Sequence, residues 1–178
     1  MKKVGLTGNI ASGKSEVENI LKEMGYKVVC ADKLSHDALS DEKIKKEIID
    51  SLNTIDREEL GQIVFSDTLK RKKLEGIIHP FVIKEINNFF ELNKNENLLF
   101  ASVPLLFEAG LQSMFDKIVF VESDDKLRFE RLIKRNGYEK DYAISRMNSQ
   151  MAQDEKIVSS DFIIKNNSDL NNLCVHIH

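Results

Sequence analysis

The sequence predicts an α/β fold in which a parallel sheet of five strands is covered by helices on both faces. Two observations support this class. Five short apolar stretches alternate with helical stretches along the chain, which is typical of parallel sheets with right-handed crossovers. In addition, residues 8–15 form a glycine-rich loop that fits the pattern G-x-x-x-x-G-K-S/T between the first strand and the first helix. Ligands of such sheets bind at the carboxyl ends of the strands.

The predicted strands share a short apolar core, and the middle ones are apolar without interruption, as expected for strands that helices cover on both faces. A helix follows the glycine loop, because Val17, Ile20, Leu21 and Met24 have the spacing of one helix face. The five expected strands are Lys3–Thr7, Tyr26–Ala31, Leu98–Val103, Lys117–Glu122 and Asp161–Asn166.

A long helical segment separates the second and third strands, although a crossover needs only one helix. Its apolar positions mark helices around Ile48, Ile63, Ile77 and Ile86. The surplus predicts an inserted helical subdomain that covers a substrate. We therefore expect one domain with a core (about 1–35, 96–134 and 157–178), a helical substrate-binding subdomain (about 36–95) and a lid (about 135–156).

The composition is that of an ordinary globular protein that binds small molecules. The chain has 178 residues, of which 42% are hydrophobic and 31% are charged, and its net charge of −3 argues against an extended nucleic-acid surface. Cys30 and Cys174 have no zinc or disulfide spacing, no apolar run reaches the ~20 residues of a membrane span, and no signal peptide precedes the first strand. These features predict a cytoplasmic protein without an obligate protein partner.

The glycine loop has the composition that a polyphosphate requires. Gly8 and Gly13 permit backbone angles that turn successive N–H groups toward phosphate oxygens at the positive end of the helix. Lys14 can then reach the β- and γ-phosphates, and the Ser15 hydroxyl can bind Mg²⁺.

Two acidic groups follow predicted strands. Asp32, after the second strand, could accept the proton of an attacking hydroxyl and help to bind Mg²⁺, or it could cap a helix that starts at Lys33. The residues Ser123-Asp124-Asp125 after the fourth strand are more simply explained as the cap of a helix that begins near Lys126.

Arginines and one histidine are further candidates. Arg131 and Arg135 lie one helical turn apart before a break at Asn136-Gly137, which suits a lid that closes on phosphates, whereas most arginines on helices are simply solvated. Arg128 and Arg146 are weaker candidates. His79 precedes Pro80 at an expected junction between two helices, where a structural role is the simpler explanation.

With these residues in place, the sequence resembles the dephospho-coenzyme A kinase family over nearly its whole length. The most particular matches are Val103-Pro104-Leu105-Leu106-Phe107-Glu108 and Ile78-x-His-Pro80, since many unrelated enzymes share the phosphate loop. Further matches are Ala31–His36, Asp56–Leu60 leading to Val64-Phe65, Arg71 with Leu74, Arg131-Leu132 with Arg135, Arg146 with Gln150-Met151, Lys156 and Ser160–Asn166.

The resemblance implies a P-loop kinase fold and transfer of the γ-phosphate of ATP, with Mg²⁺, to the ribose 3′-hydroxyl of dephospho-coenzyme A. Asp32, Lys14, Arg131 and Arg135 would be catalytic, and Ser15 and Asp32 would bind the metal. The acceptor would lie against Asp32, His79, Pro104, Leu105 and Glu108, and ATP against Gly8, Asn9, Ile10, Ala11, Ser12, Gly13, Lys14, Ser15 and Glu16.

Three positions depart from the family's pattern. Asn9 and Ala11 stand where many members have glycine; Asn tolerates left-handed backbone angles, so we expect Ala11 to take a right-handed one. Glu16 replaces a hydroxyl residue that often follows the loop. The chain also ends soon after its last predicted strand, which leaves the packing of that sheet edge open.

Two other functions remain as alternatives. A nucleoside or nucleotide kinase would share the loop, the lid and the aspartate, and only the acceptor motifs separate it. A regulatory P-loop NTPase such as a GTPase would need N-K-x-D and D-x-x-G motifs, and the sequence contains neither.

Overall fold

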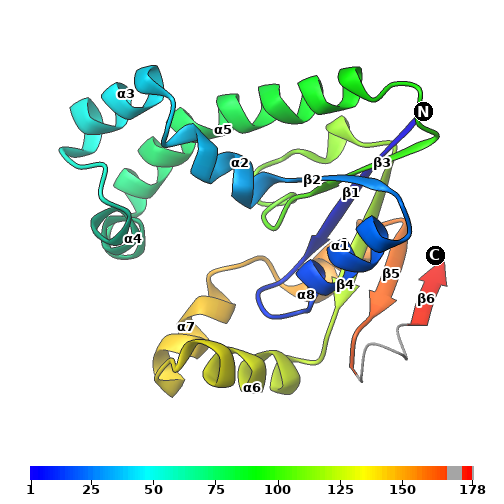
Figure 1. The fold of residues 1–178 in the computed structure, drawn as a ribbon. Helices are drawn as coiled ribbons and strands as arrows, with labels where there is room; N and C mark the ends of the chain where they lie inside the picture. The colour runs from blue at the N-terminus through cyan, green and yellow to red at the C-terminus, as the bar shows by residue number, and fades with distance from the viewer. Residues whose placement is uncertain (168–173, 178) are drawn as a thin grey trace. The chain divides into compact units, whose positions relative to one another are not determined.

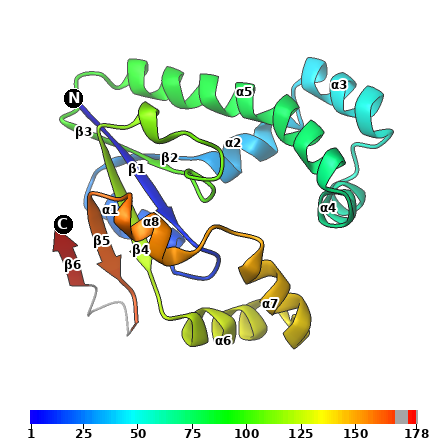
Figure 2. The same ribbon diagram turned by 180° about the vertical axis from the view of Figure 1, so that it is seen from behind.

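The computed structural model describes residues 1–167 and 174–177 of the chain. Its contacts group into two compact units, the first made of Met1–Val29 with Asn93–His178 and the second of Cys30–Leu92. Figures 1 and 2 show their elements from opposite sides. In the part of the chain that the structure describes, no helix is both long and apolar enough to span a membrane.

The first unit is built on a sheet with the strand order β2-β3-β1-β4-β5-β6. The predicted five-stranded parallel sheet is confirmed, and each predicted strand agrees with the observed one to within one residue at either end. The strands are β1 (Lys2–Gly8), β2 (Lys27–Cys30), β3 (Leu98–Ser102), β4 (Lys117–Glu122), β5 (Phe162–Lys165) and β6 (Cys174–Ile177).

The sixth strand was not predicted. It pairs antiparallel with β5, with Phe162 opposite Ile177 and Lys165 opposite Cys174. The expected end of the sheet at β5 is therefore wrong, because β6 supplies backbone partners along that edge. The central strand β1 pairs in parallel with both β3 and β4, so its carboxyl end, where the glycine loop begins, lies in the middle of the sheet.

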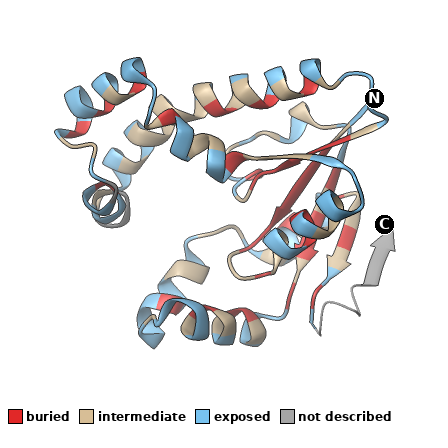
Figure 3. Ribbon diagram, in the orientation of Figure 1, coloured by how far each residue is buried: buried red, intermediate tan, exposed pale blue. Residues whose placement is uncertain are grey.

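Helices cover both faces of this sheet. The helix α1 (Lys14–Glu23) lies in front of the strands in Figure 1, and α8 (Gln153–Val158) lies in front of them in Figure 2. Val17 and Leu21 of α1 pack with Leu6 and Val121 of the sheet, and Figure 3 shows the central strands mostly buried. The remaining elements of this unit are a short 3₁₀ helix (Gln112–Met114), α6 (Asp125–Asn136) and α7 (Lys140–Asn148).

The second unit contains the predicted helical insert. Its helices are α2 (Ala31–Ala38), α3 (Glu42–Leu52), α4 (Arg57–Ser66) and α5 (Thr68–Leu92). Three of them start at an aspartate whose carboxylate accepts two backbone N–H groups of the first turn: Asp41 for α3, Asp56 for α4 and Asp67 for α5. Such caps satisfy N–H groups that have no partner within the helix.

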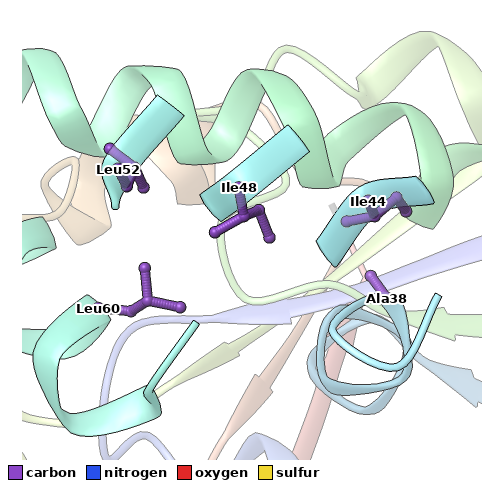
Figure 4. Packing of buried hydrophobic residues seen from close by; sticks show 5 residues of the cluster. All are labelled: Ala38, Ile44, Ile48, Leu52 and Leu60. Atoms are coloured by element: carbon purple, nitrogen blue, oxygen red, sulfur yellow. The ribbon is translucent and has the colours of Figure 1, made fainter. Parts of the chain in front are cut away.

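A separate hydrophobic core holds these helices together. Figure 4 shows the buried side chains Ala38, Ile44, Ile48, Leu52 and Leu60 at its centre. Partly buried residues of α5, Leu74, Ile77, Ile78 and Phe81, pack against them. The insert therefore has its own apolar core.

The expected junction between two helices at His79 and Pro80 is wrong, because α5 runs through both residues without interruption. Proline removes the hydrogen bond to the carbonyl four residues earlier, which here belongs to the exposed residue Gly76. Water can reach that carbonyl. Apolar contacts on either side of Pro80, made by Ile78 and Phe81, hold the helix together across the lost bond.

Candidate active site

The glycine loop joins β1 to α1 and needs each of its two glycines for a different reason. A Cβ atom on Gly8 would lie 2.6 Å from Ser12 Oγ and 2.8 Å from the Val121 carbonyl oxygen. Gly13 has a φ of 90°, and a Cβ atom there would lie 1.9 Å from Asn166 Nδ2. The first glycine therefore allows close packing, and the second allows both close packing and a left-handed backbone.

Of the two loop positions where many family members have glycine, Ala11 and not Asn9 takes a left-handed backbone. Ala11 has a φ of 62°, so it takes the left-handed conformation that we expected it to avoid. Asn9 is absent from the described residues with positive φ; instead, its buried side chain donates from Nδ2 to the Met151 carbonyl oxygen at 3.0 Å. The side-chain amide of Asn9 thus joins the loop to the segment that precedes α8. The left-handed backbone falls on Ala11, which carries a Cβ atom.

On one side, the loop leads directly into the N-terminus of α1 and Lys14. Lys14 and Ser15 are the first residues of α1, and the first N–H groups of a helix have no carbonyl partner within it. The Lys14 ammonium group donates to the Ser102 hydroxyl at the end of β3, at 2.6 Å. Glu16 follows in the first turn and is exposed. This arrangement is the one a polyphosphate binds, with amides, a helix N-terminus and a lysine side by side.

The opposite side of the loop, where carbonyl groups lie, is held by two arginines of α6. Arg131 donates from one terminal nitrogen to Ala11 O (3.4 Å), Ser12 O (3.5 Å) and Ser123 Oγ (3.1 Å), and from the other to Asn166 O (3.2 Å). Arg128, only 3% exposed, donates to Ile10 O at 3.4 Å and pairs with Asp125.

Arg135 is placed differently from Arg131. It is exposed near the end of α6, and its Nε donates to the neighbouring Asn136 side chain at 2.8 Å. Gly137, with a φ of 64°, then ends the helix as predicted. The two arginines that sequence spacing grouped together therefore have different surroundings: Arg131 contacts the phosphate loop itself, and Arg135 is free to meet a ligand from solvent.

The segment after β3 carries the residues that the resemblance assigns to the acceptor. The Pro104 carbonyl oxygen accepts the Thr7 hydroxyl of β1 at 3.2 Å, and Leu105 is 40% exposed. Glu108 Oε1 accepts the Met151 N–H at 3.1 Å and lies 2.6 Å from the ammonium group of Lys156, which is fully buried in α8. Glu108 thus links the acceptor segment to the base of the predicted lid.

The other two acceptor candidates belong to the second unit. Asp32 is the second residue of α2, is exposed, and follows β2 closely along the chain. The alternative that Asp32 caps a helix starting at Lys33 is wrong, because the helix already begins at Ala31 and its N-cap is Cys30. His79 is half-buried within α5.

Three residues that hold the loop or its arginine were not predicted as site residues. Asn166, at the carboxyl end of β5, donates to Ser12 O at 2.9 Å; Gln150 accepts the Ile10 N–H at 2.7 Å. Ser123, which we assigned only to a helix cap, donates its hydroxyl to Asn166 O at 2.9 Å. The rule that residues after parallel strands line the site points to Ser123, for which we preferred the helix cap, and it could also have identified Asn166. Gln150 and Asn166 stood out only as matches to the family.

One carboxylate near Lys14 also has a shifted pKa. Glu18 is 7% exposed in α1; burial raises its pKa, but hydrogen bonds from Lys22 and Ser102 and the charge of Lys14 together hold the pKa below its usual value. Among the described residues, no group of three His, Cys, Asp or Glu side chains could hold a metal ion.

Comparison with known proteins agrees with this geometry. The model of the family described as dephospho-CoA kinase matches residues 2–172. Curated dephospho-CoA kinases of Fusobacterium nucleatum and Listeria innocua are 41% and 38% identical to the chain; the first match covers 96% of this chain and 92% of the relative, and the second covers 95% and 90%.

Solved structures show the same relationship. TT1252 from Thermus thermophilus superposes with a TM-score of 0.84 at 29% identity, covering 95% of this chain and 90% of that one. Dephospho-CoA kinase from Campylobacter jejuni has a TM-score of 0.70 at 30% identity, covering 96% and 90%. A shikimate kinase from Bacteroides thetaiotaomicron, with a TM-score of 0.52 at 13% identity and coverage of 92% and 85%, shares the fold alone.

The phosphate loop with Lys14 follows the central strand of five parallel strands, and the helix α6 carries arginines. These features define a P-loop kinase that uses ATP to phosphorylate a small molecule. Within that class the chain belongs to the dephospho-CoA kinase family.

Proposed function

We propose that this chain transfers the γ-phosphate of ATP to the ribose 3′-hydroxyl of dephospho-coenzyme A, giving coenzyme A and ADP. The observation that carries the proposal is the phosphate loop with Lys14 beside the Pro104–Glu108 segment, joined to it through Thr7 and Ser102. The family match over residues 2–172 supports the choice of acceptor.

The donor side of the reaction rests on the loop. Its amides and Lys14 would bind the β- and γ-phosphates, and Arg135 would close on them from the lid. The Ser12 hydroxyl, buried and without a hydrogen-bond partner among the described residues, is a further donor that a phosphate oxygen would satisfy. We propose that Arg131 acts through the loop, because its contacts are with loop carbonyls.

Mg²⁺ is part of the same proposal. Magnesium is usually bound by one or two protein oxygens together with substrate phosphates and water, so a site without a cluster of three acids fits it. Ser15, exposed in the first turn of α1, would supply the hydroxyl, and Asp32 is the candidate carboxylate. The ion would neutralise charge on the transferred phosphoryl group.

Asp32 is the proposed base on the acceptor side. It would accept the proton of the 3′-hydroxyl while that oxygen forms a bond to the γ-phosphorus and the bond to the ADP oxygen breaks. Pro104, Leu105 and Glu108, with His79, would hold the rest of the acceptor; the exposed Leu105 side chain offers it apolar surface. We place the reaction in the cytoplasm.

The function is tested by incubating purified protein with ATP, Mg²⁺ and dephospho-coenzyme A and identifying the products by mass. We expect coenzyme A and ADP in equal amounts. Lys14→Ala should remove most of this activity, because the variant lacks the charge that faces the β/γ-phosphates. Phosphorylation of nucleosides or nucleotides in a parallel panel, with dephospho-coenzyme A untouched, would instead support the rival kinase.

The role of Asp32 is tested by Asp32→Asn, with Asp37→Asn as the matched control at the other end of the same helix. Loss of a positioned base should lower turnover by about 10²–10⁴-fold, while ATP affinity and melting temperature change little. Asp37→Asn should behave as the wild type. Normal turnover in Asp32→Asn would refute the assignment, and a parallel loss of MgATP affinity would indicate a metal-binding role instead.

A further inference from the structure

The segment between α7 and α8 is hydrogen-bonded to the start of the phosphate loop. The Gln150 side chain accepts the Ile10 N–H at Oε1, at 2.7 Å, and the Met151 carbonyl oxygen accepts the Asn9 side-chain amide at 3.0 Å. Figures 1 and 2 both show this connection beside the loop that follows β1. Residues 150 and 151, which we call the strap, therefore hold two consecutive residues of the loop.

The strap is held from its other side by Glu108. The Oε1 atom of Glu108 accepts the Met151 N–H at 3.1 Å and lies 2.6 Å from the ammonium group of Lys156. Lys156 is fully buried, and a buried cation is costly without its anion. The ammonium group thus fixes the carboxylate, and the carboxylate fixes Met151. The N–H of Met151 is bound to the acceptor segment and its carbonyl to the loop.

The N–H groups of the loop fall into two sets. Two of them are used within the protein, that of Ile10 by Gln150 and that of Ser12 by the Asn9 carbonyl oxygen at 3.0 Å. In the described part of the chain we find no protein acceptor for those of Ala11, Gly13, Lys14 and Ser15. Since a backbone donor needs a partner, Gln150 removes one N–H from the set that is left for a ligand. It also fixes the peptide plane from which the remaining ones follow.

We propose that Gln150 is a positioning residue for nucleotide binding. Its side chain holds the peptide group between Asn9 and Ile10, so that the N–H groups that follow meet the phosphates, and Glu108 keeps Gln150 in place through Met151. The proposal rests on the phosphate loop binding ATP. It gives Glu108 a task on the nucleotide side, in addition to the proposed contact with the acceptor.

The first test compares Gln150→Met, which keeps the length of the side chain but has no amide oxygen, with the control Ser149→Ala. Ser149 is the exposed neighbour of Gln150, and its hydroxyl donates to the Arg146 carbonyl oxygen. Calorimetry measures the Kd of MgATP without an acceptor. A hydrogen bond of this kind changes an equilibrium constant by about two- to tenfold, so Gln150→Met should raise the Kd by that factor. Ser149→Ala should bind MgATP as the wild type does.

Steady-state kinetics separates positioning from a structural role. A loop that is less often in its binding conformation loses affinity for the ground state and the transition state alike. The KM for ATP should therefore rise in Gln150→Met, while kcat stays within about twofold of the wild type. A role in stability alone would lower the melting temperature and leave the Kd and KM of the folded protein unchanged. That outcome would overturn the proposal, as would a loss of kcat at an unchanged Kd.

The second test asks whether Glu108 acts through the strap. The double variant Glu108→Leu with Lys156→Met removes the bond to Met151 without leaving a buried ammonium group unpaired. It should raise the Kd of MgATP, and adding Gln150→Met should raise it by clearly less than in the wild-type background, because interactions that act as one unit are not additive. Glu108→Gln keeps an oxygen that can accept the Met151 N–H and should bind MgATP nearly as the wild type does.

The cycle has a clear opposite result. Additive effects would show that Gln150 and Glu108 act separately, and would overturn the proposal. If the Glu108→Leu/Lys156→Met variant does not fold, Asn9→Ala takes its place, because it removes the other bond to Met151. A wild-type Kd in folded Gln150→Met also refutes the inference. Failure of the wild type to bind MgATP at all would instead refute the proposed function.

Discussion

The contacts of Arg131 lead to a prediction that separates it from Arg135. Arg131→Lys keeps the positive charge but loses the planar fork that bridges the loop, Ser123 and Asn166. Two of its four hydrogen bonds are of good length, 3.1 Å to Ser123 Oγ and 3.2 Å to Asn166 O. The other two, at 3.4 and 3.5 Å to the loop carbonyls, add little.

The expected loss of stability follows from these bonds. A hydrogen bond to a charged group contributes about 1.5–3 kcal/mol, and a lysine can keep one of the two strong bonds, so the variant should lose about 2 kcal/mol. Two of the three carbonyl groups that lose Arg131 keep another donor, because Asn166 donates to Ser12 O and Ser123 donates to Asn166 O. For a chain of this size the melting temperature should fall by about 4–8 °C.

The assay is thermal unfolding together with ATP affinity, and Arg135→Lys is the matched control. Arg135 is exposed and bonds only its neighbour Asn136 in the described structure, so its replacement should leave the melting temperature within about 1–2 °C of the wild type. If Arg135 closes on the phosphates, its variant should lose turnover instead. An unchanged melting temperature and ATP affinity in Arg131→Lys would refute the reasoning from the fork.

Three further changes have measurable outcomes. Ala11→Gly should raise the free energy of unfolding, measured in urea, by about 0.5–1 kcal/mol. The change removes the strain of a left-handed alanine, about 1–2 kcal/mol, but part of this gain is lost because glycine loses more chain entropy on folding. A loss of stability would contradict this. Lys156→Met removes the buried partner of Glu108, and because 22% of the Glu108 side chain remains exposed, the loss should stay below the ~3–5 kcal/mol of a fully buried pair, as denaturant titration would show. Burial raises the pKa of Asp161, but hydrogen bonds from Lys117 and the Ile118 N–H outweigh this effect and hold the pKa below its usual value. The stability that the ionised carboxylate contributes is complete above about pH 4 and is lost as pH falls below it. The melting temperature of Asp161→Asn should therefore depend less on pH in that range than that of the wild type.

The sheet was predictable because its signals are local. Each strand is a short apolar run bounded by polar residues, and such a run can be located without knowledge of its distant partners. The antiparallel strand β6 has no such signal. Cys174–Ile177 is only four residues long and contains His176 among apolar residues, and its antiparallel pairing with β5 cannot be inferred from its own composition.

The helical insert was predicted in kind and missed in one detail. Apolar spacing indicated α3, α4 and both halves of α5, whereas α2 was expected only as the alternative helix after Asp32, and Pro80 predicted a division of α5 at a residue where the structure continues. The rule that proline ends a helix considers only the lost backbone hydrogen bond. It takes no account of the contacts that Ile78 and Phe81 make with the core of the insert. A proline is tolerated in a helix when packing on both sides compensates and the freed carbonyl meets water, and neither condition is visible along the sequence.

The phosphate loop shows the limit of motif reasoning most clearly. The pattern predicted the need for glycine at positions 8 and 13, because a Cβ atom at either position would clash with its neighbours. The carbonyl side is held by Arg131 from α6 and by Asn166, which is 154 residues from the Ser12 oxygen that it contacts. Arg131 was read as a clamp for the phosphate because its chemistry suits anions. A guanidinium also donates hydrogen bonds to carbonyl oxygens, and in this loop Arg131 donates to those of Ala11 and Ser12. The partners of those carbonyls must come from elsewhere in the sheet, so the conformation of the loop depends on β4, β5 and α6 being in place.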